Sequence, residues 1–179
     1  PWVEGFIADL KRFDPRQPHR LDEFEAQLGR DYLTQILRRY WIHLGGRALT
    51  AFRRTLPPQP VEQVLSDSCA AELSDTRHFH MDLFGNYIPG LCAGLAIRGE
   101  DLGTPLREQD YPVLQRLYTQ GVRGLYQWAL ANFGFQPQRS GYLNKCDLCT
   151  EIRTYLAKNA DETFNELKPL EFYHESALS

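Results

Sequence analysis

The stretch Gly141-Tyr142-Leu143-Asn144-Lys145-Cys146-Asp147-Leu148-Cys149 decides how the second half of the chain folds. It holds two of the four cysteines in a Cys-x-x-Cys arrangement, and a helix-like run follows directly. Two residues between cysteines let a tight turn aim both thiolates at one metal centre, and the free N–H groups that open a helix suit the negative charge of that centre. The spacing serves zinc sites, iron–sulfur sites and redox-active cysteine pairs. The redox pair is disfavoured because no βαβ unit surrounds the motif.

The other two cysteines, Cys69 and Cys92, flank a stretch with the periodicity of a β-strand. Polar and apolar residues alternate from His78 to Leu83, a Phe-Gly-Asn turn follows, and residues 87–92 are expected to return as a second strand. Such a hairpin would deliver Cys92 near its end, between two glycines that let the backbone approach a bulky ligand. We therefore expect all four sulfurs to meet around one metal centre.

Composition excludes several classes of function. The chain has 179 residues, 42% of them hydrophobic and 24% charged, and a formal net charge of -3. This charge gives no basis for binding nucleic acid or an anionic membrane. No apolar run of about 18 residues is present, so we expect no transmembrane helix. Without a visible signal peptide, four cysteines favour reduced thiols and metal ligation in the cytoplasm over disulfides. Because the chain starts at Pro1 rather than Met, we expect a fragment or a processed product.

Helical periodicity dominates the rest of the chain. The pattern predicts helices over 22–28, 31–44, 47–56, 107–120, 124–133, 147–158 and 163–173. The prolines of residues 57–60 mark a boundary. We predict a helical leader or bridge over 1–60, which would follow a missing N-terminal portion, and a cysteine-ligated metal-binding domain over 61–179. The expected fold is α+β and mostly helical, with one antiparallel β-hairpin and a Cys-x-x-Cys knuckle opening a helix.

Two polar clusters each have a functional and a plain explanation. His78, His80 and Asp82 share one face of the predicted strand, which is typical of a second metal site but more often of a hydrogen-bonded polar face. A basic cluster surrounds the Gly45-Gly46 break, where it could bind an anion or an acidic partner but is more often a solvated helix face. Its members are Arg38, Arg39, Arg47, Arg53 and Arg54.

The order of these features resembles the C-terminal auxiliary domain of radical S-adenosylmethionine (radical SAM) proteins, of the SPASM or shorter twitch type. The matching features are a cysteine, a His-x-Asp-x-x-Gly-Asn hairpin, a Pro-Gly-x-Cys-x-Gly ending and a downstream Lys-Cys-x-x-Cys that opens a helix. The resemblance spans residues 66–173. It implies an auxiliary [4Fe-4S] cluster that relays an electron or holds substrate, with the ligands Cys69, Cys92, Cys146 and Cys149.

Further residues have expected roles beside the cysteines. Lys145, Arg98 and Arg153 could donate to the sulfurs of the cluster, although each is more often an ordinary surface charge. From the strand pattern, His80 or Asp82 could reach a substrate or orient the hairpin. Two departures matter: four cysteines suffice for one cluster, and the radical-initiating Cys-x-x-x-Cys-x-x-Cys motif is absent. We therefore expect no S-adenosylmethionine cleavage by this chain alone, and a radical SAM core domain or protein as its partner.

Two alternatives use the same four cysteines. They could close a tetrahedral structural zinc site in a domain that mediates protein interaction. They could also be small buried apolar residues of a metal-free interaction module. Hydrolase motifs and glycine-rich phosphate loops are absent from the sequence. Iron and sulfide analysis of an anaerobic preparation would separate these possibilities.

Overall fold

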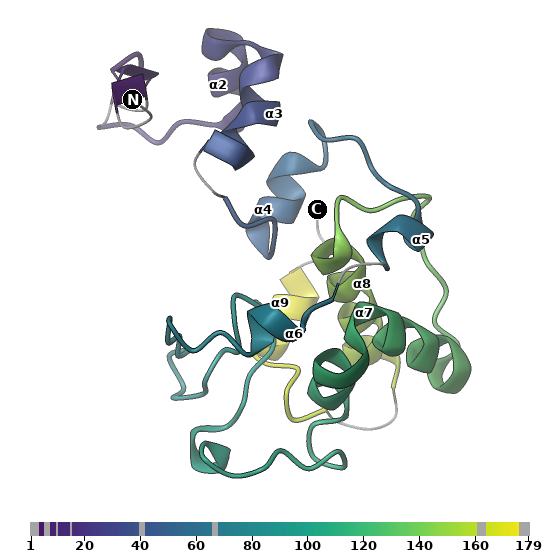
Figure 1. Ribbon diagram of the computed structural model, residues 1–179. Coiled ribbons are helices and arrows are strands. Elements are labelled where there is room, and N and C mark those ends of the chain that lie inside the picture. The colour runs from purple at the N-terminus through teal and green to yellow at the C-terminus, as the bar shows by residue number, and fades with distance from the viewer. Residues whose placement is uncertain are drawn as a thin grey trace.

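The computed structural model describes residues 4–5, 8–9, 11–14, 16–39, 42–65, 68–160 and 164–175. These residues fold into helices joined by long loops (Figure 1). The elements are α2 (Leu21–Leu28), α3 (Arg30–Arg39), α4 (Arg47–Phe52), α5 (Val61–Val64), α6 (Ala70–Leu73), the 3-10 helix η1 (Gly99–Asp101), α7 (Pro112–Phe133), α8 (Lys145–Asn159) and α9 (Leu170–Glu175).

The predicted antiparallel β-hairpin is wrong, although the mostly helical fold is confirmed. The part of the chain that the structure describes has isolated β-bridges, such as Met81 with Tyr87, and no strand. A strand that alternates polar and apolar residues needs a second layer to cover its apolar face. Here Phe79 is 67% exposed and Leu83 is fully exposed, so no such layer exists. The carboxylate of Asp82 instead closes a tight loop by accepting the amides of Phe84 and Asn86.

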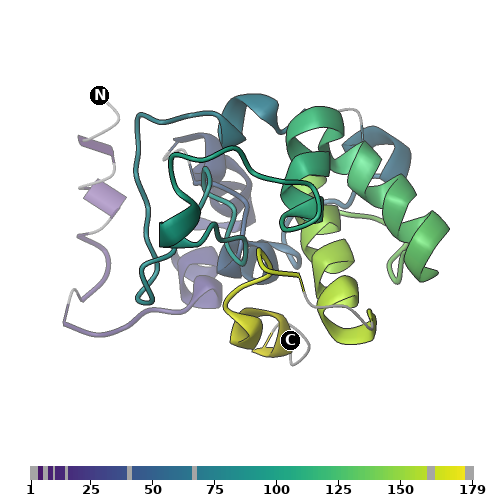
Figure 2. The ribbon, with the colours of Figure 1, turned by 90° about the horizontal axis from the view of Figure 1, so that it is seen from below.

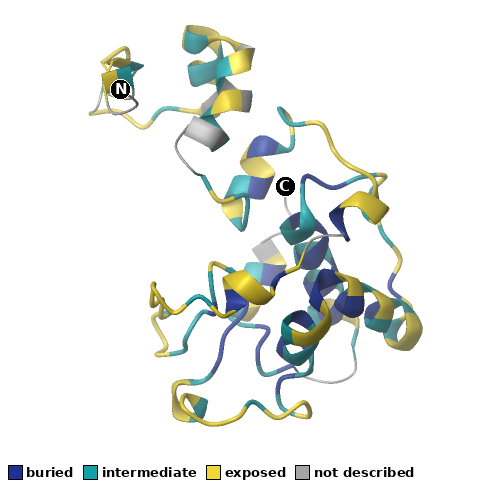
Figure 3. Cartoon of the chain, viewed as in Figure 1, coloured by how far each residue is buried: buried dark blue, intermediate teal, exposed yellow. Residues whose placement is uncertain are grey.

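The helices α7 and α8 pack against each other and carry most of the core (Figure 3). Gly121 interrupts α7 with a φ of 65°, so the two helices predicted there form one element with a kink. The long loop region between α6 and α7 lies beside this pair, as Figure 2 also shows. This arrangement places the loop carrying Cys92 near the first turn of α8.

Two of the three N-terminal helices described, α3 and α4, end earlier than predicted. Helix α2 ends before Gly29 as expected, but Arg20 rather than Asp22 occupies its N-cap position. Helix α3 ends at Arg39, and α4 ends at Phe52 rather than at residue 56. Helices α2 and α3 lie at one end of the molecule, away from α7 and α8 (Figure 1).

A second, smaller core joins the N-terminal part to the stretch before α8. Leu49 and Phe52 of α4 bury their side chains against Leu143. Gln59, in the proline-rich boundary, exchanges two backbone hydrogen bonds with Tyr142, at 2.8 and 2.9 Å. Residues before and after the predicted boundary therefore both contact the Cys-x-x-Cys stretch, while the division into two domains stays a prediction.

Candidate metal centre

Three separate segments bring the four cysteines to one pocket. Cys69 occupies the N-cap position of α6, Cys92 lies in a turn whose amide bonds to the carbonyl of Pro89, and Cys146 and Cys149 lie in the first turns of α8. All four are free thiols, and all four line a deep pocket of about 30 Å³. The sequence-based expectation that the knuckle opens a helix is confirmed. Whether the four sulfurs are ligands stays a prediction.

Close backbone packing brings the first two cysteines together. Gly90 has a φ of +57°, and a Cβ atom there would lie 2.7 Å from the carbonyl oxygen of Glu72. A glycine is therefore required where the Cys92 turn meets α6. We expected this glycine to make room for a ligand, but it makes room for the backbone of α6.

An ion pair ties α6 to α8 beside the pocket. The Lys145 ammonium donates to the Glu72 carboxylate at 2.5 Å and also to the carbonyl of Ser68. Lys145 precedes Cys146, and Ser68 precedes Cys69. The pair therefore fixes the two cysteine-bearing segments relative to each other.

A buried carboxylate between the two knuckle cysteines anchors the start of α8. Asp147 is 1% exposed and accepts from Arg53 and Arg139, each at 2.9 Å, and from the amide of Leu143 at 3.0 Å. Asn144 caps the helix by accepting the amide of Asp147 at 2.9 Å. We call Asp147, Arg53 and Arg139 the Asp147 clamp. It holds the knuckle in place without using the cysteines.

The thiols lie in an environment that disfavours their ionisation when no metal is bound. Burial, with a smaller effect of the neighbouring thiols, raises the pKa of Cys69, Cys92 and Cys146 to about 12 each. A bound metal ion or cluster would reverse this preference, because a coordinating thiol is deprotonated.

A buried guanidinium lies beside these thiols. Arg153 of α8 is 4% exposed, lines the deep pocket and interacts electrostatically with Cys149 and Cys92. Its Nη atoms donate to the carbonyl of Ala93, the hydroxyl of Tyr173 and the hydroxyl of Thr150, at 2.9, 2.9 and 3.2 Å. Its Nε atom is buried without a partner.

The charge of Arg153 is not balanced by a carboxylate. Within the described ranges, Arg153 forms no ion pair, and no Asp or Glu lines the deep pocket. A buried charge is costly unless it is paired. The pocket therefore has the electrostatics of a site for an anionic group.

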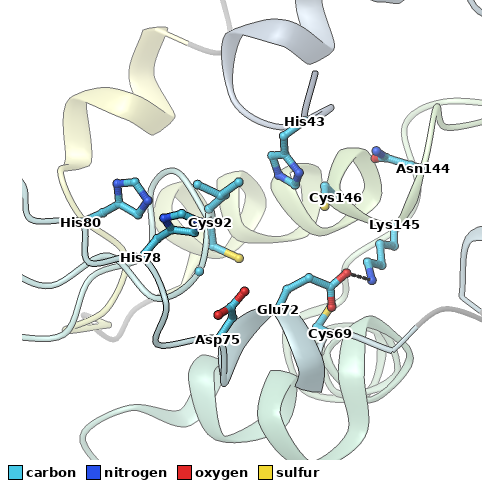
Figure 4. Close-up of a pocket in the computed structure, with 12 residues that line it drawn as sticks. His43, Cys69, Glu72, Asp75, His78, His80, Cys92, Asn144, Lys145 and Cys146 are labelled. Atoms are coloured by element: carbon cyan, nitrogen blue, oxygen red, sulfur yellow. Dashed lines mark hydrogen bonds and ion pairs between the residues drawn. The ribbon is translucent and has the colours of Figure 1, made fainter. Parts of the chain in front are cut away.

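A wider pocket of about 340 Å³, which we call the outer pocket, shares lining residues with the deep one; its lining is drawn in Figure 4. Cys69, Cys92 and Cys146 line both pockets, whereas Cys149 lines only the deep one. Figure 4 shows His78 and His80 on one side of the opening and the Lys145–Glu72 pair on another. A group larger than one ion on the four thiols would extend into this outer pocket.

The structure places the remaining predicted residues as follows. Lys145 and Arg153 lie beside the cysteines, and His80 lines the outer pocket. Arg98 lies elsewhere, because it pairs with Asp101 at 2.7 Å in the turn formed by η1.

The described members of the two polar clusters lie in separate places. His78 and His80 lie side by side at the outer pocket, but Asp82 closes its own loop. In the basic cluster, Arg53 belongs to the Asp147 clamp and Arg54 is exposed. The side chains of Arg38 and Arg39 lie outside the described residues.

Sequence reasoning missed three residues of the site. His43 comes from the N-terminal part and lines both pockets, and burial lowers the pKa of its imidazole. Glu72 pairs with Lys145, and Tyr173 accepts from Arg153. None has a motif around it. The sequence offered one signal, the carboxylate of Glu72, which lies three residues after Cys69 in the short helix that Cys69 begins.

No three His, Cys, Asp or Glu side chains in the described part of the chain are arranged to hold a metal ion. The fit of a metal centre therefore rests on the shared pocket and on the charge of Arg153. Comparisons with protein-family models, with curated proteins and with solved structures gave no match. Among the helices that the structure describes, none is both long and apolar enough to cross a membrane.

Proposed function

We propose that this chain is an auxiliary [4Fe-4S] cluster-binding domain of a radical SAM-type enzyme, with Cys69, Cys92, Cys146 and Cys149 as ligands. The observation that carries the proposal is the buried Arg153 guanidinium, which lies beside four thiols and pairs with no carboxylate of the described residues. Four thiolates around a cluster provide the missing negative charge. When bound there, such a cluster supplies one-electron redox chemistry or holds a substrate.

The outer pocket favours a cluster that communicates with its surroundings. Structural zinc sites are closed by their four ligands. Here a pocket of about 340 Å³ opens onto three of the four cysteines, which gives a substrate or an electron-transfer partner access to them. The partner we propose is a radical SAM core domain or protein, and the proposed location is the cytoplasm, where thiols stay reduced.

A structural zinc site is the second candidate. The deep pocket, with about 30 Å³ and four cysteines, has room for one ion. Zinc would serve folding, and it would need neither the outer pocket nor a redox partner.

Metal analysis separates the two candidates. The chain would be produced anaerobically with iron and sulfide, and iron, zinc, labile sulfide and the visible spectrum would be measured. We expect about four irons and four sulfides per chain, lost in Cys92→Ser and Cys146→Ser. One tightly held zinc in a colourless protein would establish the second candidate, and a folded chain without either metal would reject both.

A second experiment tests the charge argument. In the metal-free chain, Arg153→Met should change the unfolding free energy by no more than about 1 kcal/mol, because losing three hydrogen bonds is offset by removing an unpaired buried charge. In the loaded chain, the same change should release iron at least several times faster. Arg116→Met is the matched control, since Arg116 stacks on Trp128 away from both pockets. A loss above about 3 kcal/mol without metal, or unchanged iron release, would contradict the argument.

A further inference from the structure

We propose that Tyr173 is a positioning residue that holds the Arg153 guanidinium against the cysteine pocket, so that helix α9 sets how readily the metal centre accepts an electron. This inference rests on the proposed function. It assigns a role to the C-terminal segment, which contributes no ligand.

The C-terminal segment runs alongside the chain that follows Cys92. The amide of Ala96 donates to the carbonyl of Glu166 at 2.9 Å, and the amide of Lys168 donates to the carbonyl of Gly94 at 3.2 Å. This pairing, seen also as a bridge between residues 95 and 167, fixes the segment to the Cys92 turn. Any displacement of the segment would therefore also shift the turn that carries Cys92.

The packing of α9 depends on the absence of a side chain at Gly94. Gly94 has a φ of +83°, and a Cβ atom there would lie 2.5 Å from the ring of Phe172 and 2.8 Å from the hydroxyl of Tyr173. The aromatic side chains of α9 therefore rest directly on the backbone two residues after Cys92.

The Tyr173 hydroxyl links that backbone to the buried cation. It donates to the carbonyl of Gly94 and accepts from Arg153 at 2.9 Å. Tyr173 is 1% exposed, so water does not compete for these bonds. The other partners of Arg153 are Ala93, next to Cys92, and Thr150, next to Cys149. Tyr173 is thus the partner of Arg153 that lies on neither cysteine-bearing segment.

A cation held near a metal centre favours its reduction, because reduction adds negative charge. Without the Tyr173 hydroxyl, the Arg153 guanidinium keeps its charge but loses one of its three hydrogen-bond acceptors. Reduction of the centre should then become less favourable. We expect the potential to change more than the overall stability does.

The test compares the midpoint potential of the iron–sulfur centre in three full-length, anaerobically reconstituted proteins. In Tyr173→Phe, the equilibrium constant for reduction should fall about tenfold, which is about 59 mV for a one-electron couple. The control is Tyr155→Phe. Tyr155 lies on α8 and, like Tyr173, donates to a backbone carbonyl, that of Phe133 at 2.7 Å, but it lines neither pocket. The midpoint potential of Tyr155→Phe should match that of the wild type.

A double variant shows whether Tyr173 acts through Arg153. Arg153→Gln should lower the midpoint potential at least as far as Tyr173→Phe does. The potential is measured on the fraction of protein that carries the iron–sulfur centre. Adding Tyr173→Phe should change it little further. Additive shifts, or a lowered melting temperature of Tyr173→Phe at an unchanged potential, would leave Tyr173 a purely structural residue and overturn the inference. If the wild-type chain takes up no iron, the proposed function fails and the inference fails with it.

Discussion

Replacing Asp147 by asparagine should destabilise the chain chiefly by removing its ion pairs, and part of its hydrogen bonding is lost with them because an amide has a single acceptor oxygen. The change keeps the shape of the side chain but leaves the Arg53 and Arg139 guanidinium groups, each 2.9 Å away, without their shared negative charge. Removing one partner of a buried ion pair costs about 3–5 kcal/mol. The arginine side chains are 33% and 28% exposed, and Arg139 keeps its bond to Glu151, so we expect a loss of about 2–3 kcal/mol.

The assay is urea unfolding of the metal-free chain, followed by far-ultraviolet circular dichroism. Asp101→Asn is the matched control, because Asp101 also pairs with an arginine, Arg98, and accepts from a tyrosine, but lies away from both pockets. It should lose about 1 kcal/mol or less, as expected for a partly exposed pair.

A double-mutant cycle completes the test. Arg53→Met combined with Asp147→Asn should show a coupling of at least about 0.5 kcal/mol, as expected for residues in contact. If Asp147→Asn unfolds within about 0.5 kcal/mol of the wild type, the Asp147 clamp does not hold the knuckle and our account of the site is refuted.

Four further substitutions test other parts of the structure. Burial raises the pKa of Glu166 to about 7 from an ordinary 4.5, so the free energy of unfolding should fall by about 3 kcal/mol as the pH rises between these values. In urea-unfolding measurements, Glu166→Gln should flatten this pH dependence. An unchanged pH dependence would exclude Glu166 as its source. In thermal unfolding, Gly94→Ala should lower the free energy of unfolding by about 2–4 kcal/mol, because the residue has a positive φ and its Cβ would clash with Phe172 and Tyr173. Gly103→Ala, with a φ of +81° and nothing within 4 Å, should lose only about 1 kcal/mol. Cys146→Ser should remove the metal and lower the melting temperature of the loaded chain together, whereas equal melting would show that the core stands alone.

The sequence was informative where local chemistry decides the structure. The spacing of Cys146 and Cys149 was enough to predict a knuckle at the start of a helix, and Gly121 was enough to predict a break in α7. The alternation of residues 78–83 gave a wrong strand. Alternation requires a layer to cover the apolar face, and that layer is a tertiary feature that the sequence does not display.

The surroundings of the cysteines were harder to predict for a related reason. His43 and Tyr173 reach the site from segments far from the cysteines in sequence, and single residues at such distances carry no spacing signal. Arg98 had the right charge but sits beside its own counter-ion, Asp101, three residues away. A nearby carboxylate could have warned against Arg98, while the lack of an ion pair between Arg153 and a carboxylate of the described residues is visible only in the fold.

The wide separation of the residues around the pocket also constrains when the site can form during synthesis. The pocket draws on His43, on cysteines between positions 69 and 149, and on Tyr173 through Arg153. Contacts between such distant positions form late, after the intervening chain has been made. Until α9 docks, Arg153 lacks its bond to the Tyr173 hydroxyl. Under the proposed function, a cluster would be inserted only after these segments have come together, and the nascent chain would need a reducing environment to keep its thiols free.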